Sequence, residues 1–345
     1  YFAAASVPRI FSGGWVMIPK SNIRQQGAAL MGIVLVVFVS ASTLLFSAVR
    51  PPDAIDAIDT RTYQELKAAK ASLIAFAVNY ASYNNDGLGP GRLPCPDAFL
   101  TSQPYWNGCN WEYVLRLPEY VPLPNGTNFH LNDYYADRDL QFWYAISSSY
   151  RWYKATFPVV NTTTGTELTI DGDPYVAVLI AAGPALEGQD REAVENSSNR
   201  YGAYENLEGD NKWWGYKTFV TADPDDPENF NDVVIGITQS ELMSPITAVV
   251  VAEIKPLLDT WHEDNGDTFP TDGAEFATAM AGAPAWYARD EWDDVANYNF
   301  ISAYLATVQF DDCDIVYTLT LPDPGADPDD PIPPPVSRAP NTCDP

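Results

Sequence analysis

The most strongly apolar part of the chain is the run from Ala28 to Val49, in which no residue is charged. At about 1.5 Å of rise per residue, a helix of this length is about long enough to cross the ~30 Å core of a bilayer. The apolar region of a cleaved secretory signal needs only about 7–15 residues. We therefore expect a membrane helix over 28–50, with the side that carries Lys20 and Arg24 in the cytoplasm.

A second helix is predicted after Pro51-Pro52, which interrupts helical hydrogen bonding. Thr62 and Glu65 form a T-x-x-E capping box within it, and the breaker-rich stretch NNDGLGPGRLP ends it near Asn84. Its apolar positions recur mostly at three- and four-residue spacings: Ile55, Ile58, Leu66, Leu73, Ala77 and Tyr80.

The middle of the chain alternates loops with short strands. TELTIDGDPYVAVLIAAG contains a strand, an Asp171-Gly172 turn and a second strand from Tyr175 to Ala181, which is a strong hairpin signal. NDVVIGIT and CDIVYTLTL are two further strand candidates. The sequence thus predicts an α+β fold with antiparallel sheet.

A second capped helix begins at Thr238-Gln-Ser-Glu241 and runs into an Asn-Gly-Asp breaker followed by Pro270, as the first runs into Asn85-Asp86-Gly87 and Pro90. This similarity has two explanations. Either the chain contains two helix-led lobes that arose by duplication, or two unrelated helices happen to end in similar loops. The expected organisation is a leader over 1–27, with translation expected to start at Met17, then the membrane helix 28–50, a first lobe 51–237, a second lobe 238–321 and a Pro- and Asp-rich tail 322–345.

Charge narrows the classes of partner. With 46 acidic and 19 basic residues the formal net charge is −27, so nucleic acid and anionic lipid surfaces would repel the chain. The hydrophobic content of 46% is enough for a sizeable core. The composition fits a folded extracytoplasmic region.

Four cysteines permit three disulfide pairings. The sequential pairing is the simplest: Cys95 with Cys109 closes a short loop, and Cys313 with Cys343 fixes the tail. Four reduced, buried thiols are the alternative, but a membrane-crossing segment would deliver these residues outside the cytoplasm, where disulfides persist.

Motifs for enzymatic chemistry are missing from the sequence. The two histidines, His130 and His262, belong to no HExxH, and there is no GxSxG or P-loop lysine motif. The loop Gly87-Leu-Gly89-Pro-Gly91 cannot open a phosphate-binding helix, because Pro90 and Pro94 interrupt it. With so many acidic residues, carboxylate pairs are expected by chance. We therefore expect no enzyme, no catalytic residue and no cofactor.

Two binding hypotheses stay open. Aromatic stretches such as NKWWGY and PAWYARDEW could stack on sugars or fill the core. Calcium is the ion that fits the acidic stretches DPDDPENFND, ARDEWDD and DPGADPDD, although none has EF-hand spacing and acidic turns are usually solvated. The sequence assigns no metal ligand.

The segment from Met17 to Val49 resembles the N-terminus of a type IV prepilin or type II secretion pseudopilin, with a short positive leader ending in glycine before an apolar helix. In that family a prepilin peptidase cuts after the glycine, here Gly27, and the new first residue, here Ala28, is usually methylated. The family usually has Glu at the fifth mature position, which is Gly32 here. Minor and tip subunits tend to lack this acid. An uncleaved signal anchor is the ordinary alternative.

The segments GRLPCPD, DLQFWYAIS and AAGPALEGQDR also resemble a group of proteobacterial prepilin-like proteins with large extracytoplasmic parts. The resemblance implies a minor or tip subunit of a pilus or pseudopilus, held in the inner membrane with a periplasmic ectodomain before assembly, or displayed at the cell surface. Its partners would be other pilins through the N-terminal helix, the peptidase and the inner-membrane assembly platform. A membrane-anchored adhesin or carbohydrate-binding protein is the second hypothesis, and an anchored hydrolase is a distant third.

Overall fold

The computed structural model describes the part of the chain that follows the predicted membrane helix. The described residues are 60–83, 87–97, 114–132, 142–152, 158–183, 185–187, 207–212, 217–223, 229–321, 336–338 and 343. Among them no helix is long and apolar enough to cross a membrane. The predicted leader and membrane helix, with Gly27 and Ala28, lie outside these ranges, as does Cys109.

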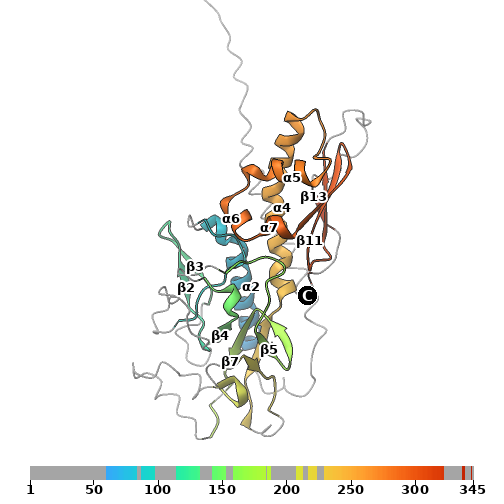
Figure 1. The fold of residues 1–345 in the computed structure, drawn as a ribbon. Coiled ribbons are helices and arrows are strands. Elements are labelled where there is room, and N and C mark those ends of the chain that lie inside the picture. Colours follow the sequence, from blue (N-terminus) through green and yellow to red (C-terminus); the bar gives the residue numbers. More distant parts are fainter. Residues whose placement is uncertain are drawn as a thin grey trace, which may run out of the picture. The chain divides into compact units, whose positions relative to one another are not determined.

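The described elements alternate between helix and sheet (Figure 1). The helical segments are α2 (Thr60–Tyr83), η2 (Ser148–Tyr150), η4 (Gly209–Lys212), α4 (Gln239–Asp264), α5 (Gly273–Ala279), η6 (Met280–Gly282), α6 (Ala285–Arg289) and α7 (Trp292–Val295). The strands are β1 (Leu115–Arg116), β2 (Tyr120–Pro122), β3 (Asn128–His130), β4 (Phe142–Ile146), β5 (Leu168–Ile170), β6 (Asp173–Tyr175), β7 (Ala177–Ala181), β8 (Thr218–Phe219), β9 (Val233–Ile237), β10 (Ala296–Ser302), β11 (Leu305–Phe310), β12 (Val316–Thr320) and β13 (Val336–Arg338). The α+β class with antiparallel sheets is as the sequence predicts, except that β8 pairs parallel with β5.

Helix α2 leads a four-stranded antiparallel sheet of order β1-β4-β7-β9, which follows chain order. Strands β4 and β7 are buried at every position, because both faces of this sheet are covered. One face packs on α2 and α4 in the main core, and the other faces the small sheet β6-β5-β8. Uniformly apolar strands are what burial on two faces requires.

The predicted capping box of Thr62 and Glu65 does not start α2. The helix already includes Thr60, so Thr62 lies inside its first turn, where an N-cap side chain has no role. The helix ends at Tyr83, close to the predicted end at Asn84. Its buried side chains include Leu66, Leu73 and Tyr80, as the apolar spacing predicts.

The predicted hairpin of residues 166–183 is confirmed, with one refinement. Asp171 and Gly172 form the turn with positive φ angles of 51° and 94°, the conformation that favours Asp-Gly in two-residue hairpins. The second predicted strand is divided at Val176 into β6 and β7, which belong to two different sheets. The chain therefore passes from one layer to the next at this residue.

Helix α4 begins as the sequence predicts. Thr238 accepts a hydrogen bond from the backbone of Glu241, and the Glu241 side chain accepts one from the backbone of Thr238, which completes a capping box. Glu241 also pairs with Lys70 of α2 at 2.7 Å. The 26 residues of α4 span about 39 Å at helical rise.

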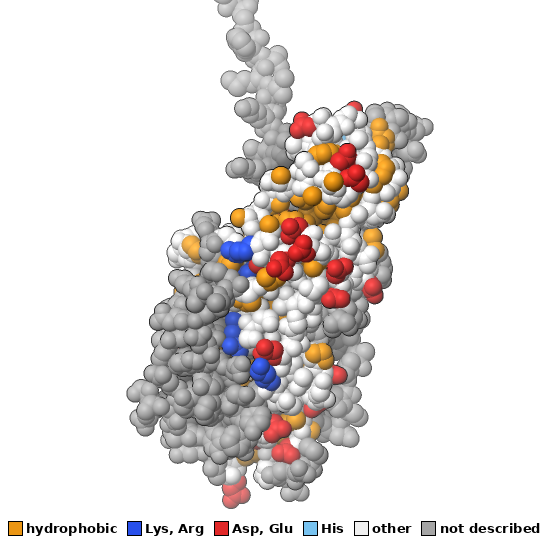
Figure 2. All heavy atoms as spheres, viewed as in Figure 1, with side chains coloured by type: hydrophobic (Ala, Val, Ile, Leu, Met, Phe, Trp, Pro, Cys, Tyr) orange, Lys and Arg blue, Asp and Glu red, His pale blue; other side chains and the backbone are white. Residues whose placement is uncertain are grey.

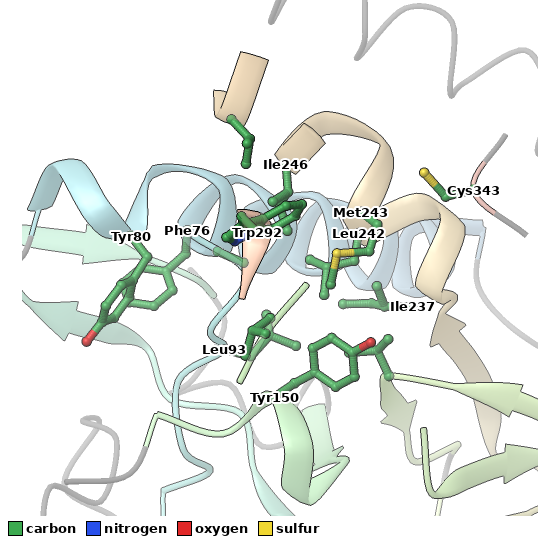
Figure 3. Packing of buried hydrophobic residues seen from close by; sticks show 14 of the residues in the cluster. Phe76, Tyr80, Leu93, Tyr150, Ile237, Leu242, Met243, Ile246, Trp292 and Cys343 are labelled. Atoms are coloured by element: carbon green, nitrogen blue, oxygen red, sulfur yellow. The ribbon is translucent and has the colours of Figure 1, made fainter. Parts of the chain in front are cut away.

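Helix α4 also packs against a second antiparallel sheet of order β10-β11-β12-β13, where Thr247 hydrogen-bonds to Tyr317 of β12, so this helix contributes to both layers of core (Figure 1). Alternating burial along β11 and β12 shows that this sheet buries one face only. Figure 3 shows Phe76 of α2, Ile246 of α4 and Trp292 of α7 in the same cluster of buried side chains. The apolar core therefore continues across the boundary predicted at residue 238.

The disulfide between Cys313 and Cys343 is present, with an S–S distance of 2.01 Å. It ties residue 343 to the start of the segment that leads into β12. Cys95 is also disulfide-bonded and buried. Its pairing with Cys109 stays a prediction, because Cys109 lies outside the described residues.

Candidate functional site

Among the described residues, the most deeply buried charged groups are Arg92 and Asp290, which we call the Arg92–Asp290 junction. Arg92 Nη2 lies 2.6 Å from Asp290 Oδ1, and Arg92 Nη1 donates to Asp290 Oδ2 at 2.9 Å. The two side chains are 0% and 1% exposed. This two-pronged geometry suits guanidinium and carboxylate, which form two parallel hydrogen bonds.

Further hydrogen bonds pair other polar atoms of Arg92, of Asp290 and of the surrounding backbone. The Gly89 backbone N–H donates to Asp290 Oδ2 (3.1 Å), and Arg92 donates to the carbonyl oxygens of Gly89 (3.1 Å) and Pro158 (3.0 Å). Asn161 Nδ2 donates to the Asp290 carbonyl at 3.0 Å. The junction thus joins the loop after α2, the loop before β5 and the turn between α6 and α7.

The glycine-rich loop 87–91 serves this junction rather than an external anion. A Cβ on Gly89 would stand 2.5 Å from Asp290 Oδ2 and 3.0 Å from the Trp286 ring. Gly91 has a φ of 102°, and a Cβ there would meet Val160 at 2.5 Å. Glycine is needed because an internal carboxylate and its neighbours approach the backbone closely. The loop does not open a helix, as the sequence predicts.

We predict that Asp290→Ala lowers the free energy of unfolding by about 3–5 kcal/mol, because it leaves the Arg92 guanidinium buried without its carboxylate. Urea denaturation followed by tryptophan fluorescence measures this loss.

The matched control is Glu167→Ala, which removes a 2.7 Å pair with Lys217 whose side chains are 36% and 40% exposed. Its effect should stay below about 1 kcal/mol. Equal losses in the two variants would contradict a structural role for the junction.

Glu208 and Asp232 form a second buried acidic pair. The Glu208 N–H donates to Asp232 Oδ2 at 2.9 Å, and the Asn231 N–H donates to Glu208 Oε2 at 3.3 Å. Asn211 Nδ2 adds a bond to Asp232 Oδ2 at 3.1 Å. The two residues therefore fasten the segment around η4 to the residue that precedes β9.

Burial raises the pKa of Asp232 well above its ordinary value of 3.8, and the neighbouring Glu208 carboxyl raises it further. The folded protein keeps this proton at pH values where the unfolded chain has lost it. The contribution of Asp232 to stability is therefore greatest in acid, and it declines as the pH rises from about 3.8 through the raised pKa.

We predict that Asp232→Asn flattens this part of the pH dependence, because the amide is neutral at every pH. The free energy of unfolding, measured by urea denaturation at about pH 4 and about pH 7, should fall less in the variant than in the parent protein. Asp210→Asn, at an exposed position of η4, is the control and should leave the difference unchanged. An unchanged slope in Asp232→Asn would contradict the assignment.

Two acidic side chains in the stretches considered for calcium binding take part in these internal contacts instead. Asp290 of ARDEWDD is paired with Arg92, and Asp232 of DPDDPENFND is hydrogen-bonded to Glu208 and Asn211. Within the described ranges no group of three or more His, Cys, Asp or Glu side chains is placed to hold a metal ion. DPGADPDD lies outside those ranges, and calcium binding stays a prediction.

The aromatic stretch PAWYARDEW packs inward. Trp286, Tyr287 and Trp292 are all buried, and Trp292 meets Phe310 edge-on with ring centroids 5.5 Å apart. Core packing is therefore the role of this stretch, and it offers no sugar-stacking platform. The pair Trp213-Trp214 lies outside the described residues.

The two histidines occupy unrelated places. His130 ends β3 and lines a small, half-open groove of about 80 Å³ together with Glu65, Ser72 and Asn132. His262 lies near the end of α4, between the rings of Phe269 and Tyr304. Sites for small molecules usually enclose most of the ligand, which this open groove does not.

No family model, curated protein or solved structure matches this chain. The function must therefore be argued from the fold and from the residues themselves.

Proposed function

We propose that this protein is a non-enzymatic pilin-like subunit, processed by a prepilin peptidase and placed at the tip of, or sparsely within, a type IV pilus or type II secretion filament. The observation that carries the proposal is the arrangement around α2. This helix follows the apolar segment 28–49 in the chain, and its apolar face packs on an antiparallel sheet whose strands are ordered as in the sequence. A helix that leads from an anchor into such a sheet is the plan of pilins.

The leader sequence supports the same reading. Gly27 precedes an uncharged segment long enough for a membrane helix, and a small, flexible residue lets a peptidase reach the bond at the membrane face. The subunit would begin in the inner membrane, with the residues after 50 in the periplasm. Its partners would be other pilins, the peptidase and the inner-membrane assembly platform.

Gly32 supports a terminal place in the filament. In a bundle of such helices a carboxylate at the fifth mature position is stabilised by the positive N-terminus of a neighbour, and without a neighbour it would be an unpaired buried charge. A subunit with glycine there avoids that cost when one neighbour is missing. The ectodomain, with two four-stranded sheets, is also easier to accommodate at an end than along a tightly packed shaft.

We predict that the mature protein begins at Ala28 and that Gly27→Leu keeps the leader attached. Intact-mass measurement of the protein from membranes and from sheared filaments distinguishes the two forms. Gly32→Ala, a change of similar kind beyond the cleavage site, should be processed normally. A functional form that still carries Met17 would rule out the prepilin reading and favour an uncleaved anchor.

We also predict that a tagged copy marks filament ends or sparse points along the filament. Immunogold electron microscopy of sheared filaments gives the distribution. Regular labelling along the shaft would identify a major pilin and refute the argument from Gly32. Label that stays on the cell envelope, with no filament, would favour the membrane-anchored adhesin.

A further inference from the structure

Strand β10 forms an open edge of the second sheet. The sheet has the order β10-β11-β12-β13, so β10 pairs on one side only, with β11. Across the described part of the chain, no backbone group hydrogen-bonds to residues 296–302 from the side away from β11. Such an edge presents a row of unpaired N–H and C=O groups to an added strand.

From Ala296 to Phe300 this edge lacks the features that usually block strand addition. Its sequence ANYNFIS contains no proline and no charged residue, and the one bulge lies at the far end, between Phe300 and Ser302. The end strands β1 and β13 of the two larger sheets have only two and three residues. At the remaining end strand, β9, the carbonyl of Gly236 accepts a hydrogen bond from Lys70. At seven residues, β10 is the longest strand described.

The two ends of the edge differ in chemistry. Ile301, 48% exposed, is the exposed large hydrophobic side chain of the described residues and lies near the C-terminal end of β10. At the other end, Asp293 and Asp294 lie in α7, which directly precedes the strand, and Asp311, just after the paired strand β11, accepts a hydrogen bond from Asn297 at 2.6 Å. All three carboxylates are exposed. Acidic side chains (red) are spread over the face of the described residues that Figure 2 shows.

We propose that β10 is a docking edge for an extended polypeptide segment of a partner protein, which adds as a fifth strand to this sheet. The segment carries Lys or Arg at the end where Asp293 and Asp294 precede β10, and an apolar side chain at the end beside Ile301. Backbone hydrogen bonds along the edge supply affinity, and the charged end sets the orientation of the added strand. A second copy of this chain is a poorer occupant, because each copy has a net charge of −27. The proposal does not depend on filament assembly.

The test uses the purified full chain in detergent and a fluorescent, capped nine-residue peptide of alternating threonine and valine with two lysines at one end. Fluorescence anisotropy should give saturable binding. A peptide with glutamates in place of the lysines should bind at least about tenfold more weakly, because it meets the carboxylates with like charge. A lysine peptide that is N-methylated at every central residue should also lose at least about tenfold, because neither of its edges can then donate backbone hydrogen bonds to β10.

Two pairs of variants locate the site. Ile301→Lys places a charge on the edge and should reduce binding of the lysine peptide at least about tenfold. Asn128→Lys adds the same charge at an exposed position of β3 and should change it less than about twofold. The double change Asp293→Asn with Asp294→Asn should weaken binding, while Glu263→Gln with Asp264→Asn, at the exposed end of α4, should not.

Equal binding of the N-methylated peptide would overturn the proposal, because attraction between charges alone would then explain the affinity. Equal losses in the matched control variants, or absence of binding, would overturn it as well. Self-association of the chain that Ile301→Lys abolishes would identify a second copy as the occupant, and would overturn the assignment to a cationic partner.

Discussion

The structure depends on one buried ion pair that joins distant parts of the chain. Arg92 and Asp290 are 198 residues apart in sequence, yet they form two hydrogen bonds and their side chains are at most 1% exposed. A pair of this kind adds little net stability compared with apolar packing, but either charge alone would be strongly destabilising. The loop after α2 and the turn after α6 must therefore be in place together. This condition explains why the loop requires glycine at position 89.

The sequence predicted those elements whose signals are local. The Asp171-Gly172 turn and the Thr238–Glu241 capping box each involve residues within a few positions of one another, and both are formed. The prediction of a capping box at Thr62 and Glu65 was wrong. This motif caps a helix only if the helix begins at its first residue, whereas α2 already includes Thr60. The sequence also does not show that the strand after Asp173 changes sheet at Val176, because this depends on packing between layers.

The buried polar contacts could not be predicted in this way. Glu208 and Asp232 belong to different loops, and the composition offers so many acidic residues that no pair stands out. The one usable signal was an arginine inside GRLPCPD, where the neighbouring residues are apolar or loop-forming and a charge has to find a partner. The sequence excluded phosphate binding at the glycine-rich loop 87–91. It could not identify the internal carboxylate that packs against this loop. Gly27, Ala28 and Cys109 lie outside the described residues and remain predictions.

Helix α4 joins the two helix-led halves of the chain through a shared core. Its buried side chains belong to a single core cluster that also includes residues of β7 and β9 and residues of β11 and β12. Cutting the chain before α4 would expose the apolar underside of the first sheet, and cutting after it would expose that of the second. The first half also keeps a smaller cluster between its two sheets, but the main core is built from both halves. Even if the halves arose by duplication, they have lost the modularity that a repeat usually keeps.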